Sequence, residues 1–195
     1  MRTTALSLVA LLAACATAQA QEASAPPIYA QLLGGSALGL GVTFFNPFYV
    51  DATQPGYAVA AAIGVNVMDG LSVEADFLRT FRNEVAPEGD TYGTTSVMAN
   101  VKYTAMLNET FGLYGAVGAG YIWIDNYDGP APGQTYYFGG FGYQLIGGVS
   151  MAFTENLTGL LEARYQDSFH DYQVMGTDKV DIPTFSILGG LKLSF

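Results

Sequence analysis

Apolar residues alternate with small or polar residues through the last twelve positions of the sequence. In the segment 184–195 the odd positions are mostly phenylalanine, isoleucine and leucine, and the even positions are mostly small or polar. A period of two indicates a β-strand whose two faces meet unlike surroundings. The apolar face ends on Phe195. Because an exposed apolar strand edge invites association in water, this ending favours a strand that closes a barrel in lipid, with Phe195 in an interfacial aromatic girdle.

The same alternation recurs upstream and predicts eight strands. Three short turns separate pairs of alternating segments, and the Asp-Gly pair in the first of them is a strong hairpin signal. The turns are Met68-Asp69-Gly70, 107–110 and 154–156. The expected strands are 28–36, 57–67, 71–77, 96–104, 111–124, 138–153, 157–166 and 182–195. Long polar or aromatic loops are expected at 38–56, 82–95, 125–137 and 167–181.

Short connections at one end of two-strand units and long ones at the other are typical of an outer-membrane barrel. The sequence therefore predicts an all-β fold, an eight-stranded antiparallel up-and-down transmembrane β-barrel with periplasmic turns and extracellular loops. A propeller has similar repeat lengths but needs four strands in each blade. The longest uncharged run, 129–153, contains prolines and glycine pairs, so membrane-spanning helices are not expected. The main alternative is a soluble lipocalin-like barrel, in which the aromatic residues would point inward around a ligand.

The start of the sequence has the pattern of a secretory signal. Arg2 precedes an apolar segment, and Ala18-Gln19-Ala20 forms an A-x-A cleavage site. We expect residues 1–20 to be a cleaved signal peptide, 21–27 a short flexible lead, and 28–195 the barrel domain. Leu12-Ala13-Ala14-Cys15 also has the form of a lipoprotein signal, which leaves acylation of Cys15 as an alternative. Ordinary cleavage removes the only cysteine and leaves six basic and 17 acidic residues, so neither a disulfide nor nucleic acid as a partner is expected.

Assigning the large apolar residues to lipid leaves three acids and three bases on the inward parity. They are Glu74, Asp76, Lys102, Glu162, Arg164 and Lys192. An eight-stranded barrel is just wide enough for side chains to fill. Because unpaired charges would carry a large desolvation cost there, we expect these residues to pair as a lumen charge network. The network predicts a packed polar plug, with a narrow pore for ions or small solutes as the alternative.

The expected loops offer weak signals for other chemistry. Their carboxylates are oxygen ligands of the kind that Ca²⁺ prefers, but no EF-hand spacing is present, so neither a metal site nor any cofactor is expected. Ser168 and His170 would share one face of an extended strand beside Asp167 and Asp171, which is the residue set of a nucleophilic hydrolase. Nothing in the sequence marks an oxyanion hole. We therefore predict no enzymatic activity, with a lipid A-modifying barrel enzyme as an alternative.

The eight-strand pattern, the three turns and the terminal Leu191-Lys192-Leu193-Ser194-Phe195 resemble the small eight-stranded outer-membrane barrels. That family includes the OmpA transmembrane domain, OmpX and the opacity-type surface proteins, the porin family in its loose sense. The resemblance covers the whole mature chain. It implies that Phe195 is part of the signal for the barrel-insertion machinery. The His-x-Ser order of the deacylase barrels, which are enzymes with the same fold, is absent here.

From this resemblance we expect a monomer in the outer membrane of a Gram-negative bacterium. Its partners would be outer-membrane lipids, the insertion machinery and periplasmic chaperones, together with an extracellular ligand at the loops. The expected role is that of a surface protein in envelope integrity or adhesion, or as a surface antigen.

Overall fold

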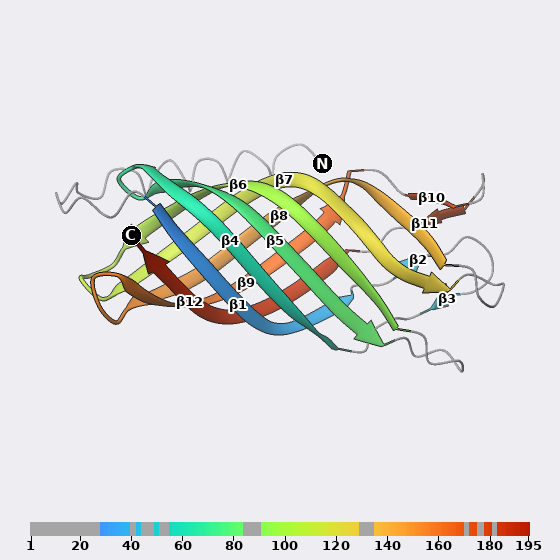
Figure 1. Ribbon diagram of the computed structural model, residues 1–195, viewed down its shortest axis with the longest axis horizontal. Helices are drawn as coiled ribbons and strands as arrows, with labels where there is room; N and C mark the ends of the chain where they lie inside the picture. The colour runs from blue at the N-terminus through green and yellow to red at the C-terminus, as the bar shows by residue number, and fades with distance from the viewer. Residues whose placement is uncertain are drawn as a thin grey trace, which may run out of the picture.

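The computed structural model is a closed barrel of eight antiparallel strands (Figure 1). The structure describes residues 28–39, 42–43, 49–50, 55–83, 91–128, 135–169, 172–174, 178–180 and 183–195. In spatial order the barrel strands are β1 (Ile28–Gly39), β12 (Thr184–Ser194), β9 (Leu157–Ser168), β8 (Thr135–Ala152), β7 (Phe111–Asp128), β6 (Thr91–Met106), β5 (Leu71–Asn83) and β4 (Gly56–Met68). The predicted fold class and strand number are confirmed. The predicted signal peptide and lead, residues 1–27, lie outside the described residues.

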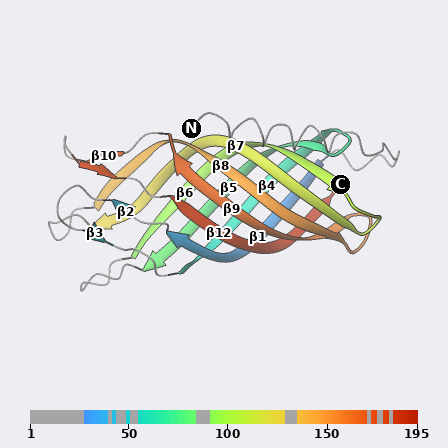
Figure 2. The ribbon, with the colours of Figure 1, turned by 180° about the vertical axis from the view of Figure 1, so that it is seen from behind.

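The barrel closes where its first and last strands meet. β1 pairs with β12 along its length, from Tyr29 opposite Ser194 to Gly39 opposite Thr184. Beyond that ladder, the Phe195 amide donates to the Ile28 carbonyl at 2.9 Å. Seen from behind, β12 and β1 lie side by side with the other strands continuing around the wall (Figure 2). No open strand edge is left in the barrel, which is what a lipid environment requires of a sheet.

The three predicted short turns all lie at one end of the barrel (Figure 1). Gly70 has a φ of 71°, a conformation that glycine adopts without the steric cost of a Cβ. In the second turn Asn108 Oδ1 accepts hydrogen bonds from the amides of Thr110 and Phe111. In the third, Thr154 Oγ1 accepts from the Leu157 amide at 3.0 Å. Each turn therefore uses the local residue type that its backbone needs.

Several strands extend further towards the opposite end than the sequence pattern predicted. β5 and β6 take up parts of the expected loop 82–95, and β7 and β8 take up parts of the expected loop 125–137. Two short hairpins, β2 (Val42–Thr43) with β3 (Tyr49–Val50) and β10 (Tyr172–Val174) with β11 (Asp178–Val180), lie within the other two expected loops. In these extensions small and polar residues occupy both faces of the strands. The alternation of residue types therefore stops before the strand does.

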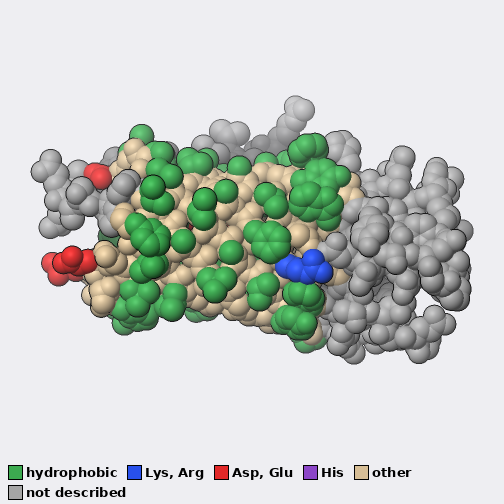
Figure 3. All heavy atoms as spheres, in the orientation of Figure 1, with side chains coloured by type: hydrophobic (Ala, Val, Ile, Leu, Met, Phe, Trp, Pro, Cys, Tyr) green, Lys and Arg blue, Asp and Glu red, His purple; other side chains and the backbone are tan. Residues whose placement is uncertain are grey.

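The barrel wall separates two kinds of side chain. Large apolar residues point outward, and Leu32, Ile63 and Phe141 expose 65–70% of their surface. On the face seen in Figure 3, hydrophobic side chains are spread over the strands, with acidic atoms at the turn end and one basic group near the opposite end. The inward positions hold most of the buried polar residues together with an apolar cluster that includes Leu33, Leu78 and Leu188. This arrangement is the reverse of the lipocalin-like alternative. Among the described residues no helix is long and apolar enough to cross a membrane.

Candidate functional site

The six charged residues predicted to face the lumen lie on four strands whose side chains meet inside the barrel. Glu74 and Asp76 come from β5, Lys102 from β6, Glu162 and Arg164 from β9, and Lys192 from β12. The first five are almost completely buried, whereas Lys192 is partly exposed. All six are at even positions of strands that send their even residues inward, so the period of two brings distant parts of the sequence together. They form two groups, which we call the Arg164 cluster and the Lys102 cluster.

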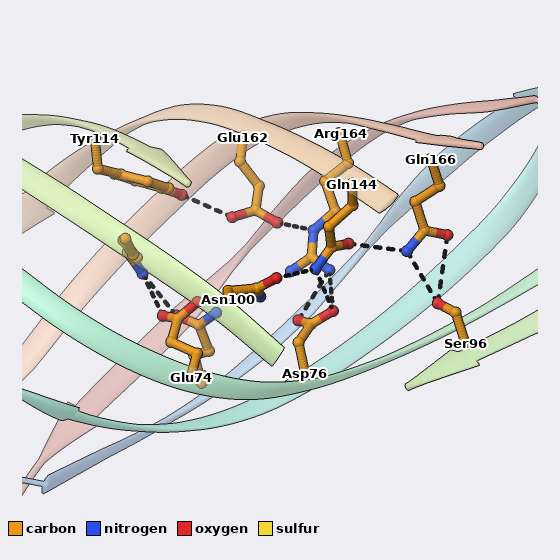
Figure 4. A network of polar contacts seen from close by, with 11 residues as sticks. Glu74, Asp76, Ser96, Asn100, Tyr114, Gln144, Glu162, Arg164 and Gln166 are labelled. Carbon is orange, nitrogen blue, oxygen red and sulfur yellow. Dashed lines mark hydrogen bonds and ion pairs between the residues drawn. The ribbon is translucent and has the colours of Figure 1, made fainter. Parts of the chain in front are cut away.

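The Arg164 cluster contains one base and two acids. Arg164 Nη1 donates to both Asp76 carboxylate oxygens, at 2.7 and 2.9 Å, and its Nε donates to Glu162. Arg164 is only 1% exposed. Asp76 also accepts from Gln144 Nε2 at 3.3 Å, and Tyr114 donates to Glu162 Oε2 at 2.9 Å (Figure 4). The guanidinium thus ties β9 to β5 across the barrel interior by charge-assisted hydrogen bonds, which are the stronger kind.

The Lys102 cluster has the opposite balance, because it contains two bases and one acid. Lys102 Nζ lies 2.7 Å from Glu74 Oε1 and 3.2 Å from Gln31 Oε1. The Tyr29 hydroxyl donates to the same Glu74 oxygen at 2.7 Å. Lys192 Nζ lies 5.2 Å from the centre of the Tyr29 ring and makes no ion pair within the described part of the chain. Glu74 is therefore the one carboxylate that this cluster provides for two ammonium groups.

Tyr114 on β7 connects the two clusters. Its hydroxyl belongs to the Arg164 cluster, while Lys102 Nζ lies 4.6 Å from the centre of its ring. The two inward tyrosines have room because glycines face them: a Cβ at Gly148 would collide with the Tyr114 ring, and one at Gly64 with the Tyr29 ring. Each tyrosine occupies lumen volume that a side chain on the neighbouring strand would otherwise fill.

A chain of amides continues the network from Asp76 towards the loop end of the barrel (Figure 4). Gln144 Nε2 donates to Asn100 Oδ1 at 2.6 Å, and Gln166 Nε2 donates to Gln144 Oε1 at 2.8 Å. Gln166 Nε2 also donates to Ser96 Oγ at 2.9 Å. The sequence pattern placed Asn100, Gln144 and Gln166 on the inward parity, but the charge-based prediction left them out of the site. Tyr29 and Tyr114 were left out as well, although the glycines opposite them were a signal that could have pointed to them.

Three polar atoms in the two clusters and the amide chain remain without a hydrogen bond inside the described residues. They are Glu74 Oε2, Asn100 Nδ2 and Arg164 Nη2, and all three are buried. Buried polar atoms of this kind are usually hydrogen-bonded to internal water. The lumen thus contains a connected polar network beside the inward apolar cluster.

The remaining predicted residues lie elsewhere. Phe195 is 64% exposed at the turn end, where its backbone completes the seam between β1 and β12. Of the residues considered for nucleophilic chemistry, Ser168 is the last residue of β9, and the Asp167 carboxylate accepts hydrogen bonds from the hydroxyls of Tyr143 and Tyr165. His170 and Asp171 lie outside the described residues. The described residues contain no group of three His, Cys, Asp or Glu side chains placed to hold a metal ion.

Comparison with known proteins agrees with this architecture. A family model described as the outer membrane protein β-barrel domain matches residues 6–193. No curated protein sequence matches the chain significantly.

Among solved structures, neisserial surface protein A (NspA) aligns with a TM-score of 0.66 at 15% identity, covering 86% of this chain and 97% of that one. Ail, the attachment invasion locus protein of Yersinia pestis, in complex with the heparin analogue sucrose octasulfate, aligns with a TM-score of 0.51 at 19% identity, covering 86% and 99%. OprG of Pseudomonas aeruginosa aligns with a TM-score of 0.53 at 15% identity, covering 87% and 98%. At these identities the three structures show a shared fold.

Proposed function

This chain belongs to the outer membrane protein β-barrel domain family, and from that premise we propose that it is a non-enzymatic, non-conducting surface protein. Its place is the bacterial outer membrane. In this proposal the lipid-facing strands hold the long connections at the cell surface, and the lumen network fills the barrel between them. The role is adhesion or envelope integrity, or that of a surface antigen, carried out by a monomer.

The observation that carries the proposal is the continuous network across the lumen. It runs from Ser96 through Gln166 and Gln144 to Asp76, and from there through Arg164 and Glu162 to Tyr114. Six of these seven side chains are 2% exposed or less, and the seventh, Tyr114, is 4% exposed. A conducting path would have to break charge-assisted hydrogen bonds in a medium of low dielectric constant, which is costly.

Planar-bilayer recording tests the closed lumen. We expect the purified full chain to show no stable large-conductance state. The matched positive control is Gln144→Ala with Gln166→Ala, which removes the two amides without removing a charge and should raise the conductance above that of the wild type. A nanosiemens-scale open state of the wild type would contradict the closed lumen and favour the narrow-pore alternative.

The surface role rests on the long connections. Ail is an attachment invasion locus protein, and the heparin analogue bound to it is a sulfated polyanion. Here the connections 40–55, 84–90, 129–134 and 170–182 contain many more acidic than basic residues. Like charges repel, so we propose a neutral or cationic surface ligand in place of a sulfated one.

Replacing the long connections one at a time with the turn sequence Thr154-Glu155-Asn156 tests this role in cells that display the protein. We expect at least one replacement to reduce adhesion to cell surfaces or to weaken the envelope barrier to detergent. Neutralising the turn acids Asp69, Glu109 and Glu155 is the control and should leave both readouts unchanged. If every loop replacement behaves like the wild type, the chain has no surface role of this kind.

A further inference from the structure

The outer face of the barrel carries very few charges. Among the strand side chains that the structure describes, only Arg79 and Asp167 are charged and lie on the outward parity. Arg79 is on β5 and Asp167 is on β9, and four steps around the eight-stranded ring separate these two strands. The two side chains are therefore on opposite sides of the barrel. Arg79 is the one basic side chain that this described outer face presents.

Arg79 is held in place by its neighbours. Its Nη1 donates to Thr95 Oγ1 on β6 at 3.0 Å, and its Cζ lies 5.0 Å from the centre of the Phe81 ring. Phe81 in turn stacks on Tyr57 of β4, with ring centres 4.7 Å apart and an angle of 18° between the planes. A planar guanidinium against an aromatic face is a favourable cation–π arrangement. The cation is thus supported from two neighbouring strands and presented towards the membrane.

The register places an aromatic residue on the other side of the same site. Arg79 is opposite Thr95, and Thr95 is opposite Trp123 on β7, so the three residues form one rung across three strands. Trp123 is 40% exposed and lies 4.8 Å from Tyr121, measured between ring centres. Tryptophan and tyrosine gather at membrane interfaces because their rings are amphipathic. The rung therefore combines a fixed cation with an exposed aromatic face.

The height of Arg79 along the barrel axis follows from the strand geometry. Arg79 is eight residues beyond Leu71, where β5 leaves its short turn. At about 3.4 Å per residue and a tilt of about 40°, this corresponds to roughly 20 Å along the barrel axis, near the far limit of an apolar band about 25 Å tall. Because the long connections of such barrels face the outside, that limit is the headgroup level of the outer leaflet. A charged side chain there is tolerated, whereas at the midplane it is strongly disfavoured.

We propose that Arg79, Thr95, Phe81 and Trp123 form a binding site for the phosphorylated sugar headgroup of the outer-leaflet glycolipid. Arg79 binds the phosphate, for which its planar donor fork is suited. Thr95 and Phe81 position the guanidinium, and Trp123 packs against the sugar ring. Asp167 has the wrong charge for this ligand, so the opposite side of the barrel is a natural control. The site lies on the outer wall of the barrel and uses none of the lumen residues, so it does not depend on the function proposed above.

The single tryptophan makes the site observable, since Trp123 is the only one in the sequence. The full chain would be reconstituted in phosphatidylcholine nanodiscs and titrated with bisphosphorylated lipid A, fully dephosphorylated lipid A or phosphatidylglycerol. We expect bisphosphorylated lipid A to shift the Trp123 emission at a concentration at least tenfold lower than either of the other two lipids. An equal response to dephosphorylated lipid A would contradict phosphate recognition. An equal response to phosphatidylglycerol would contradict recognition of the sugar.

Variants locate the effect. We expect Arg79→Gln to weaken the lipid A response at least tenfold, Arg79→Lys to weaken it less, and Asp167→Asn to leave it unchanged. Heat-modifiable gel mobility would establish that each variant is folded. If Arg79→Gln does not fold, the proposal is tested by the lipid A response of the Arg79→Lys and Thr95→Val proteins. The lipid discrimination of the wild type then serves as the second measurement. Wild-type affinity in the Arg79→Gln protein, or an equal loss in the Asp167→Asn protein, would overturn the proposal.

Discussion

Arg164 and Lys102 both lie inside the barrel, but they meet different numbers of carboxylates. Arg164 is shared between Asp76 and Glu162, whereas Lys102 has Glu74 for its single ion pair and has a second amine, Lys192, in its cluster. The two clusters therefore carry opposite excess charge, and only their sum is neutral. Removing a base should have different consequences in the two, because in one case two acids lose their partner and in the other case one does.

Arg164→Met is expected to have the largest effect. It leaves Asp76 and Glu162 buried without their cation, and breaking a buried ion pair from one side costs about 3–5 kcal/mol. We expect the free energy of unfolding, measured by urea titration in lipid vesicles and followed by Trp123 emission, to fall by about that amount. Adding Asp76→Asn and Glu162→Gln should restore part of the loss, because the uncompensated charges are then gone. A loss smaller than that caused by Lys102→Met would contradict the expected difference between the two clusters.

Lys102→Met is expected to have a smaller effect. Glu74 keeps the hydrogen bond from Tyr29, and Lys192 remains in the same cluster as a second source of positive charge. The loss in the free energy of unfolding should therefore be about 1–3 kcal/mol, the usual cost of leaving a buried polar group without its partner. The double variant Lys102→Met with Glu74→Gln should recover most of it, since one acid matches one base. If the double variant is no more stable than the single one, Glu74 and Lys102 are not an energetic pair.

The sequence predicted the barrel and the inward residues for one physical reason. Lipid on one face and a packed lumen on the other impose a strict alternation, and a period of two can be read directly from the chain. Glu74, Asp76, Lys102, Glu162 and Arg164 were found in this way, because each is a charged residue between apolar ones. The strand ends were missed where polar residues occupy both faces and the alternation carries no information.

The partition into two clusters could not be predicted in the same way. Which acid meets which base depends on the stagger of the strands, and this stagger brings Asp76 of β5 to Arg164 of β9 although the two strands are not neighbours. Knowing which face of the barrel wall a residue occupies does not tell which residues of other strands lie beside it. The sequence could therefore predict that the inward charges balance, but not that Lys192 has no ion pair of its own among the residues that the structure describes.

Lys192→Met is expected to have the smallest effect and tests the balance within the Lys102 cluster. Lys192 is partly exposed, interacts with Glu74 and Lys102 through charge, and lies over the Tyr29 ring at 5.2 Å. Removing it loses the attraction to Glu74 and to the ring but also relieves the repulsion from Lys102. Because these contributions oppose one another and water screens a partly exposed ammonium, the free energy of unfolding should change by less than about 1 kcal/mol.

The same urea titration would measure this change, with Lys102→Met as the reference. A loss as large as that of Lys102→Met would mean that Lys192 supports Glu74 as much as Lys102 does, and the two lumen clusters would then differ in geometry but not in energetic balance.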